Sequence, residues 1–241
     1  MKRDFSSDIV WIRTLAKRNG LDLGEEKLYK LLLFAENILL WNAKINLISR
    51  KDEENIWRKH ILESLAFVFR RSFVSPSSII DFGTGGGFPG IPLAICLPQC
   101  RFLLIDSTQK KIRAVDEILK VLQLPNVTTD AGRGEDLSST SAYQGKFDYL
   151  LARAVASVKE ILKWGSAFMK TYPPAATNET TSGSQTIPPG SMVLMKGGML
   201  EQEITEARIK CRPGSIQVLP IVIEGGDGTD LFDKKLLIIR P

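Results

Sequence analysis

The chain has 241 residues and a formal net charge of +5 at neutral pH, with 44% hydrophobic and 24% charged residues. These values are ordinary for a globular protein and exclude a disordered or membrane-embedded chain. The first residues lack the apolar core of a signal peptide, and the three cysteines fit neither a disulfide framework nor a zinc site. We therefore expect a cytoplasmic protein without a membrane segment or a bound metal.

Helices are expected to precede the first strand. Apolar residues recur at helical spacing over 25–42, which predicts an amphipathic helix. A second helix is expected over 52–70, because acidic residues open it and two arginines close it, as the helix dipole favours. We assign residues 1–75 to an N-terminal helical region and residues 76–241 to a second domain, with a turn rich in serine and proline between them.

From residue 79 onward, predicted strands and helices alternate. Helices are expected over 91–97, 109–122 and 201–210, and short apolar runs predict strands over 79–82, 101–106, 126–129, 147–152, 192–196, 216–223 and 235–239. Strands separated by helical lengths imply parallel crossovers, with helices on both faces of the sheet. The predicted fold is therefore α/β, Rossmann-like, with a mostly parallel sheet.

The segment over 172–190 has a different composition from the rest of the chain. It contains Pro, Thr, Ser, Asn, Gly and Ala, with Ile187 as its one large aliphatic residue. Such a segment buries too little apolar surface to offset the entropy of ordering it. We expect a mobile surface loop inserted between a helix and a strand.

A glycine-rich turn follows the first strand directly, over residues 83–90. Glycine adopts positive φ at no steric cost and lets a ligand approach the backbone, so this arrangement is typical of nucleotide-like ligands in α/β proteins. Two cofactors compete for it. Gly85, Gly87 and Gly90 match a dinucleotide fingerprint, whereas Asp81, Gly83, Gly85 and Gly87 match the pattern of class I methyltransferases that bind S-adenosylmethionine.

The acidic residues around this turn favour S-adenosylmethionine. The carboxylate of Asp81 would repel a pyrophosphate but suits the ammonium of a methionyl group. Asp106 ends the second strand at the spacing where an acid accepts ribose hydroxyls, a feature that both cofactors share. The loop over 131–136, after the third strand, is expected beside the adenine. A dinucleotide-dependent oxidoreductase remains the alternative on the residues alone.

The chain also resembles a known family, the small-subunit ribosomal RNA methyltransferase G family (RsmG, also called GidB), which methylates guanine N7 in 16S rRNA. The resemblance covers about residues 28–170, and the block over 83–95 is its most diagnostic part. The stretches that carry it are 41–47, 58–65, 81–95, 105–107, 110–113, 132–135, 152–156 and 194–197. It implies the class I S-adenosylmethionine-dependent methyltransferase sheet, and 16S rRNA or the small ribosomal subunit as the partner.

Site residues follow from the motifs and from the resemblance together. The residues expected to bind the cofactor are Asp81, Gly83, Gly85, Gly87, Phe88, Asp106, Ser107, Gly134, Glu135 and Arg153. The cations expected to contact RNA phosphates are Lys44, Arg50, Lys51, Arg58, Lys59, Lys110, Lys111 and Arg113. Near the last strand, where the family usually has basic or histidine residues, this chain departs from the pattern with Phe232, Asp233, Lys234 and Lys235.

No catalytic residue is expected. Guanine N7 carries a lone pair and no proton, so its methylation needs no general base. His60, the only histidine, is interpreted as a packing residue. Arg153 is expected to hydrogen-bond guanine O6 or fix a carboxylate, with a structural salt bridge to Glu135 or Asp148 as the other interpretation.

An aromatic residue is expected to support the target base. Phe88 and Trp41 are the candidates, although Trp41 could equally belong to the core. Amino-group and carbon-5 methylation are disfavoured, because the Asn/Asp-Pro-Pro-aromatic run and the nucleophilic cysteine that they use are missing after the fourth strand. A non-catalytic RNA-binding module is a third possibility.

Overall fold

The computed structural model describes residues 3–173, 185–226, 229 and 231–241. Two long helices come first, α1 (Ser6–Arg18) and α2 (Glu25–Asn42), and the second matches its predicted bounds. No bounds for α1 were predicted from the sequence. No helix in these ranges is both long enough and apolar enough to cross a membrane.

The helix predicted over 52–70 is wrong as a continuous element. The chain forms a 3-10 helix η1 (Arg50–Asn55), a π-helical turn η2 (Trp57–Ile61) and a single turn α3 (Leu62–Leu65). Residues 66–69 are all buried. They form turns after α3 and not further helix, and Arg70 at their end has a φ of +54°, which a right-handed helix does not contain.

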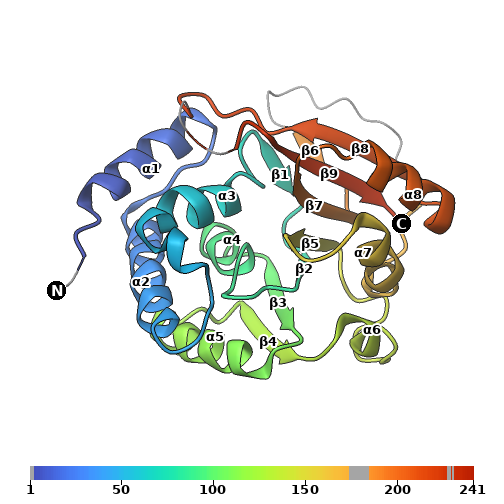
Figure 1. Cartoon of the computed structure of the whole chain (residues 1–241), viewed down its shortest axis with the longest axis horizontal. Helices are drawn as coiled ribbons and strands as arrows, with labels where there is room; N and C mark the ends of the chain where they lie inside the picture. Colours follow the sequence, from blue (N-terminus) through green and yellow to red (C-terminus); the bar gives the residue numbers. More distant parts are fainter. Residues whose placement is uncertain (1–2, 174–184, 227–228, 230) are drawn as a thin grey trace.

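A seven-stranded sheet with the strand order β4-β3-β2-β5-β7-β9-β8 forms the centre of the fold (Figure 1). Its strands are β2 (Ser78–Phe82), β3 (Arg101–Asp106), β4 (Val127–Ala131), β5 (Tyr149–Arg153), β7 (Ser191–Gly197), β8 (Ser215–Pro220) and β9 (Lys234–Arg240). All pairings are parallel except those of β9, which runs antiparallel to both β7 and β8. The prediction of a mostly parallel α/β sheet is confirmed.

Helices cover both faces of this sheet, as expected from the crossovers. Alternate residues of each strand point to opposite faces, so Ile79 and Ile80 of β2 belong to two separate core clusters. The first cluster packs under α1, α2, α3, α4 (Gly90–Cys96) and α5 (Gln109–Leu122), and the second under α7 (Val158–Gly165) and α8 (Glu201–Cys211). Two short helices, α6 (Gly134–Leu137) and η3 (Ser166–Phe168), flank α7.

The N-terminal helices share the first core cluster with the sheet. Phe34 of α2 and Ile79 of β2 are both fully buried in it. A domain boundary between residues 75 and 76 therefore stays a prediction, and in packing terms the helical region is continuous with the sheet.

The prediction of a loop over 172–190 is wrong for the last part of that segment. Residues 185–187 form strand β6 (Gln185–Ile187), which pairs in parallel with β1 (Arg71–Phe73). Ile187 is fully buried, and its carbonyl accepts a hydrogen bond from the hydroxyl of Tyr149 at 2.8 Å. The one large aliphatic residue of the segment is thus the residue that anchors it. The central part of the predicted loop, 174–184, lies outside the described residues.

Candidate functional site

A cavity of about 570 Å³ opens at the carboxyl edge of the sheet. It lies where β2 and β5 are neighbours, because the chain continues from β2 to one side and from β5 to the other. Such a switch point leaves a crevice between the outgoing loops, and the volume falls within the range of about 300–1,000 Å³ that is usual for small-molecule sites. Its walls are the loops after β2, β3, β4 and β5, together with Leu47, Ile48 and His60 from the N-terminal region.

Glycines shape the loop after β2. Gly83 has a φ of +72°, and its N–H and that of Thr84 both donate to the carbonyl of Ile105 at 2.9 Å. A Cβ at Gly83 would lie 2.7 Å from a methyl carbon of Val155, so both the backbone conformation and the space demand glycine. Gly85 also has a positive φ, of +59°, but has no neighbour within 4 Å of a built Cβ. The loop therefore turns tightly and leaves open space at Gly85.

Asp81 holds this loop from behind. Its side chain is fully buried, and Oδ2 accepts hydrogen bonds from the Thr84 hydroxyl at 2.6 Å and from the Gly90 N–H at 2.8 Å. Burial raises the pKa of this carboxyl to about 6. Asp81 is not part of the cavity wall, and neither is Gly87. The structure thus gives Asp81 an organising position, and its predicted contact with a cofactor ammonium stays a prediction.

Asp106 lies on the cavity wall at the end of β3. One carboxylate oxygen accepts the Gly85 N–H at 2.9 Å, and the other accepts the Thr108 N–H at 2.8 Å, just before α5 begins. The carboxylate is therefore fixed between the glycine loop and the start of the next helix. Ser107 follows it on the wall and is exposed.

The loop after β4 closes the opposite side of the cavity. Gly134 opens α6, and a Cβ built there would lie 2.0 Å from Cζ of Phe82, closer than any side chain tolerates. Glycine is therefore required for the close approach of α6 to β2. Glu135 also lines the cavity, and its side chain is partly exposed beside Arg133. Eight of the ten predicted cofactor residues thus meet on one cavity: Gly83, Gly85, Phe88, Asp106, Ser107, Gly134, Glu135 and Arg153.

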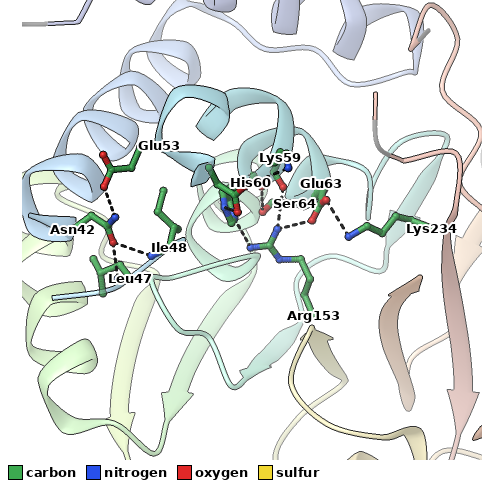
Figure 2. Close-up of polar contacts among 11 residues, drawn as sticks. Asn42, Leu47, Ile48, Glu53, Lys59, His60, Glu63, Ser64, Arg153 and Lys234 are labelled. Carbon is green, nitrogen blue, oxygen red and sulfur yellow. Dashed lines mark hydrogen bonds and ion pairs between the residues drawn. The ribbon is translucent and has the colours of Figure 1, made fainter. Parts of the chain in front are cut away.

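Arg153 is clamped by groups from the N-terminal region, as Figure 2 shows. Its Nη1 donates to Oε2 of Glu63 at 2.7 Å, and both side chains are only about a tenth exposed. Lys234 of β9 reaches the second oxygen of Glu63 at 3.1 Å. The guanidinium also lies over the ring of Phe88, 5.3 Å from its centroid. The salt bridge to Glu135 or Asp148 that was considered from the sequence is wrong, because the ion-pair partner of Arg153 is Glu63.

His60 also belongs to this wall. Its Nδ1 lies 3.0 Å from Nη2 of Arg153, its Nε2 lies 3.4 Å from Oδ2 of Asp52, and its ring packs against Phe88 at 5.1 Å. Burial, reinforced by the charge of Arg153, lowers the pKa of His60 to about 4, so the ring is neutral at physiological pH. Because Arg153 is a donor only, Nδ1 accepts and the ring proton lies on Nε2, facing Asp52.

Some residues on or behind the wall were missed by the sequence reasoning. Glu63 had a recognisable signal in the sequence, because it is the one charged residue in the mainly apolar stretch 61–69. Asn42 carried none: its side-chain oxygen accepts the N–H groups of Leu47 at 2.7 Å and Ile48 at 3.0 Å, and so fixes these two wall residues (Figure 2). Such a contact depends on tertiary packing and not on a pattern.

The cations predicted to contact RNA lie in two groups. Lys44, Arg50, Lys51, Arg58 and Lys59 come from the segment around η1 and η2, and Lys110, Lys111 and Arg113 come from α5. Of these eight cations only Lys111 lines the cavity; the first group lies on the segment that also carries the wall residue His60. Arg58 stacks on Trp11 at 4.3 Å, and Lys59 pairs with Asp52 at 3.3 Å.

Trp41 does not lie on this cavity wall. It is partly buried against the core and lines a separate cavity of about 820 Å³ beside α5. Lys44 lies over its ring at 4.8 Å. Of the two aromatic residues considered as supports for a target base, only Phe88 lines the site at the switch point.

The chain matches known proteins over most of its length. A family model described as rRNA small subunit methyltransferase G matches residues 27–173. A protein of Chlorobaculum tepidum named ribosomal RNA small subunit methyltransferase G is 32% identical over 238 residues, which cover 97% of this chain and 98% of the relative. A protein of Bacteroides fragilis with the same name is 38% identical over 182 residues, which cover 76% of this chain and 80% of the relative.

Among solved structures, TYW2 of M. jannaschii in complex with AdoMet is similar to the chain, with a TM-score of 0.52 and 15% identity. The alignment covers 82% of this chain and 78% of that structure. At this level of identity, the likeness supports the fold and carries no information about the ligand or the reaction.

Proposed function

Since the chain belongs to the rRNA small subunit methyltransferase G family, we propose that it transfers a methyl group from S-adenosylmethionine to N7 of a guanine in 16S rRNA. The observation that carries the proposal is the cavity at the switch point of a methyltransferase-type sheet, with Asp106 fixed on its wall. The substrate is free 16S rRNA or the small ribosomal subunit, which places the protein in the cytoplasm.

The residues on the wall fit S-adenosylmethionine. The left-handed backbone at Gly83 makes the turn, the open space at Gly85 lets a ligand touch the loop, and the carboxylate of Asp106 at the end of β3 suits ribose hydroxyls. In this assignment Asp106 and Ser107 bind the ribose of the cofactor, and Gly134 and Glu135 lie by its adenine. The rest of the cofactor is contacted by Gly83, Gly85 and Phe88. Asp81 and Gly87 act through the loop that they hold in place.

The cofactor, when bound, supplies a methyl group activated by the sulfonium charge. What the protein must add is orientation and exclusion of water, because N7 has no proton to remove. The environment of His60 agrees with this, since Nδ1 is hydrogen-bonded to Arg153, Nε2 is buried 3.4 Å from Asp52, and the ring is neutral. The methylated base carries a positive charge, and Glu63 keeps the charge of Arg153 compensated beside it.

Arg153 and Phe88 are the residues assigned to the target base. The guanidinium, held by Glu63 and lying 5.3 Å from the Phe88 ring centroid, carries N–H donors to which guanine O6 can be an acceptor. The cations of η1, η2 and α5 supply phosphate contacts, which position the RNA and make its binding sensitive to salt.

Isothermal titration calorimetry with S-adenosylmethionine and with NAD tests the cofactor assignment. We expect binding of S-adenosylmethionine and none of NAD; the reverse would restore the dinucleotide-dependent oxidoreductase. The catalytic assignment is tested by methyl transfer to 16S rRNA from a strain without the enzyme. Cofactor binding without transfer to free RNA or to small subunits would leave a non-catalytic RNA-binding module.

A further inference from the structure

Three exposed apolar side chains lie on segments that leave or enter the sheet at its carboxyl edge, where the cavity opens, and the proposed cofactor and target contacts use none of them. Val155 follows β5 and is 37% exposed, Met199 follows β7 and is 93% exposed, and Phe232 precedes β9 and is 88% exposed. We call these three side chains the apolar rim. Val155 is itself a residue of the cavity wall, so the rim begins where the cavity opens.

Sheet topology brings the three residues to the same edge. β5 and β7 are parallel neighbours, so the residues that follow them leave at the carboxyl edge. β9 runs antiparallel to β7, with Lys234 opposite Gly197, so the segment that enters β9 begins at that edge as well. Three segments far apart in the sequence therefore meet at the sheet edge where the cavity opens.

Polar contacts tie the three segments of the rim together. Lys196 donates to the carbonyl of Ala156, next to Val155. The Gly198 N–H donates to Oδ2 of Asp233 at 2.9 Å, and Lys235 donates to the Gly198 carbonyl at 2.8 Å, so the neighbours Met199 and Phe232 lie on joined segments.

The rim is also connected to the clamp around Arg153. Lys234, two residues after Phe232, forms its ion pair with Glu63. The backbone beneath the rim is thus held to the groups that fix Arg153. The side chains of Met199 and Phe232 are therefore the part of the apolar rim that is freely accessible to a partner.

We propose that the apolar rim is a stacking surface for unpaired bases of the RNA on either side of the target guanine. This inference rests on the proposed function. A base that enters the cavity must leave its stack, and its neighbours then expose their faces at the cavity mouth. An aromatic ring and a thioether cover such faces in the same way as the apolar wedges and stacking residues of other nucleic-acid-binding proteins. Lys235, which donates to the carbonyl of Gly198, supplies positive charge at the same edge.

The test is the kcat/KM of Phe232→Ala and Met199→Ala for methyl transfer, on protein-free 16S rRNA and on small subunits from a strain without the enzyme. Loss of one stacked base predicts a decrease of about 5- to 150-fold for Phe232→Ala on each substrate that the unmodified protein methylates. The affinity for S-adenosylmethionine and the melting temperature are expected to stay unchanged, because both side chains project into solvent. Ile209→Ala, which truncates an apolar side chain that is 65% exposed on α8, is the matched control and should show no decrease.

Two further variants separate stacking from general apolar contact. Phe232→Trp keeps a ring and should retain activity, whereas Phe232→Leu keeps an apolar side chain without a ring and should lose it. The inference is overturned if Phe232→Ala and Met199→Ala stay within about twofold of the unmodified protein, or if Leu restores activity as well as Trp does. If the unmodified protein methylates both substrates and kcat/KM of the rim variants decreases on small subunits alone, the inference is also overturned, because the rim would then contact a ribosomal protein. Failure of the proposed function would be seen separately, as no transfer by the unmodified protein.

Discussion

Glu63→Gln removes one charge from the cluster that joins the N-terminal helices to β5. Glu63 and Arg153 are 10% and 11% exposed and lie 2.7 Å apart, so the guanidinium would remain buried without its carboxylate. Breaking such a pair on one side costs about 3–5 kcal/mol, because the remaining charge is not compensated. Gln has nearly the same size as Glu, so the loss is electrostatic and leaves no cavity. Lys234, 30% exposed, can turn towards water and adds little.

Urea denaturation followed by circular dichroism measures this loss in the free energy of unfolding. Glu224→Gln is the matched control, because it breaks a pair with Arg70 in which the two side chains are 61% and 50% exposed. A pair of this kind contributes about 0–1 kcal/mol. Adding Arg153→Met to Glu63→Gln should recover much of the stability, since no buried charge is then left alone. Equal losses for Glu63→Gln and Glu224→Gln would refute the account of the cluster.

Three other perturbations have defined outcomes. Asp106→Ala should weaken S-adenosylmethionine binding in calorimetry far more than it lowers the melting temperature, and equal loss of both would make Asp106 purely structural. Gly83→Ala should cost about 1–2 kcal/mol for its left-handed backbone and also weaken cofactor binding, since its Cβ would lie 2.7 Å from Val155; Gly214→Ala, whose Cβ would meet only an ordinary contact at 3.8 Å, should do neither. Because the folded-state pKa of His60 is lowered from 6.5 to about 4, the folded chain binds fewer protons than the unfolded chain between these values. The stability of the parent relative to His60→Gln should therefore be full above pH 6.5 and decrease by about 3 kcal/mol as the pH falls to about 4; a difference that does not change with pH would contradict the neutral, buried ring.

The central sheet was predictable because its information is local. Buried parallel strands read as short apolar runs, such as 79–82 and 101–106, and their spacing fixes the crossovers. The glycine loop was predictable for the same reason, since positive φ favours glycine and the loop is therefore visible in the sequence as Gly83 and Gly85.

The predictions that were wrong concern structure set by distant contacts. The stretch over 52–70 has the charges of a helix, but it forms η1, η2 and α3, and Arg70 at its end donates its N–H to the distant carbonyl of Asn19 at 2.9 Å. β6 forms from a polar segment because Ile187 is buried and its carbonyl accepts a hydrogen bond from Tyr149. The partner of Arg153 is 90 residues away in sequence, so neither its identity nor the lowered pKa of His60 was accessible from local pattern.

The account depends most on the identity of the modified atom. The direct measurement is to treat 16S rRNA, or small subunits, from a strain without the enzyme with the protein and labelled S-adenosylmethionine, and to map the labelled nucleoside. We predict label in N7-methylguanine at a single site, reduced strongly by Arg153→Ala at saturating cofactor. Label on an exocyclic amine, on carbon 5 of a pyrimidine or on ribose would contradict the absence of a general base from the proposed mechanism.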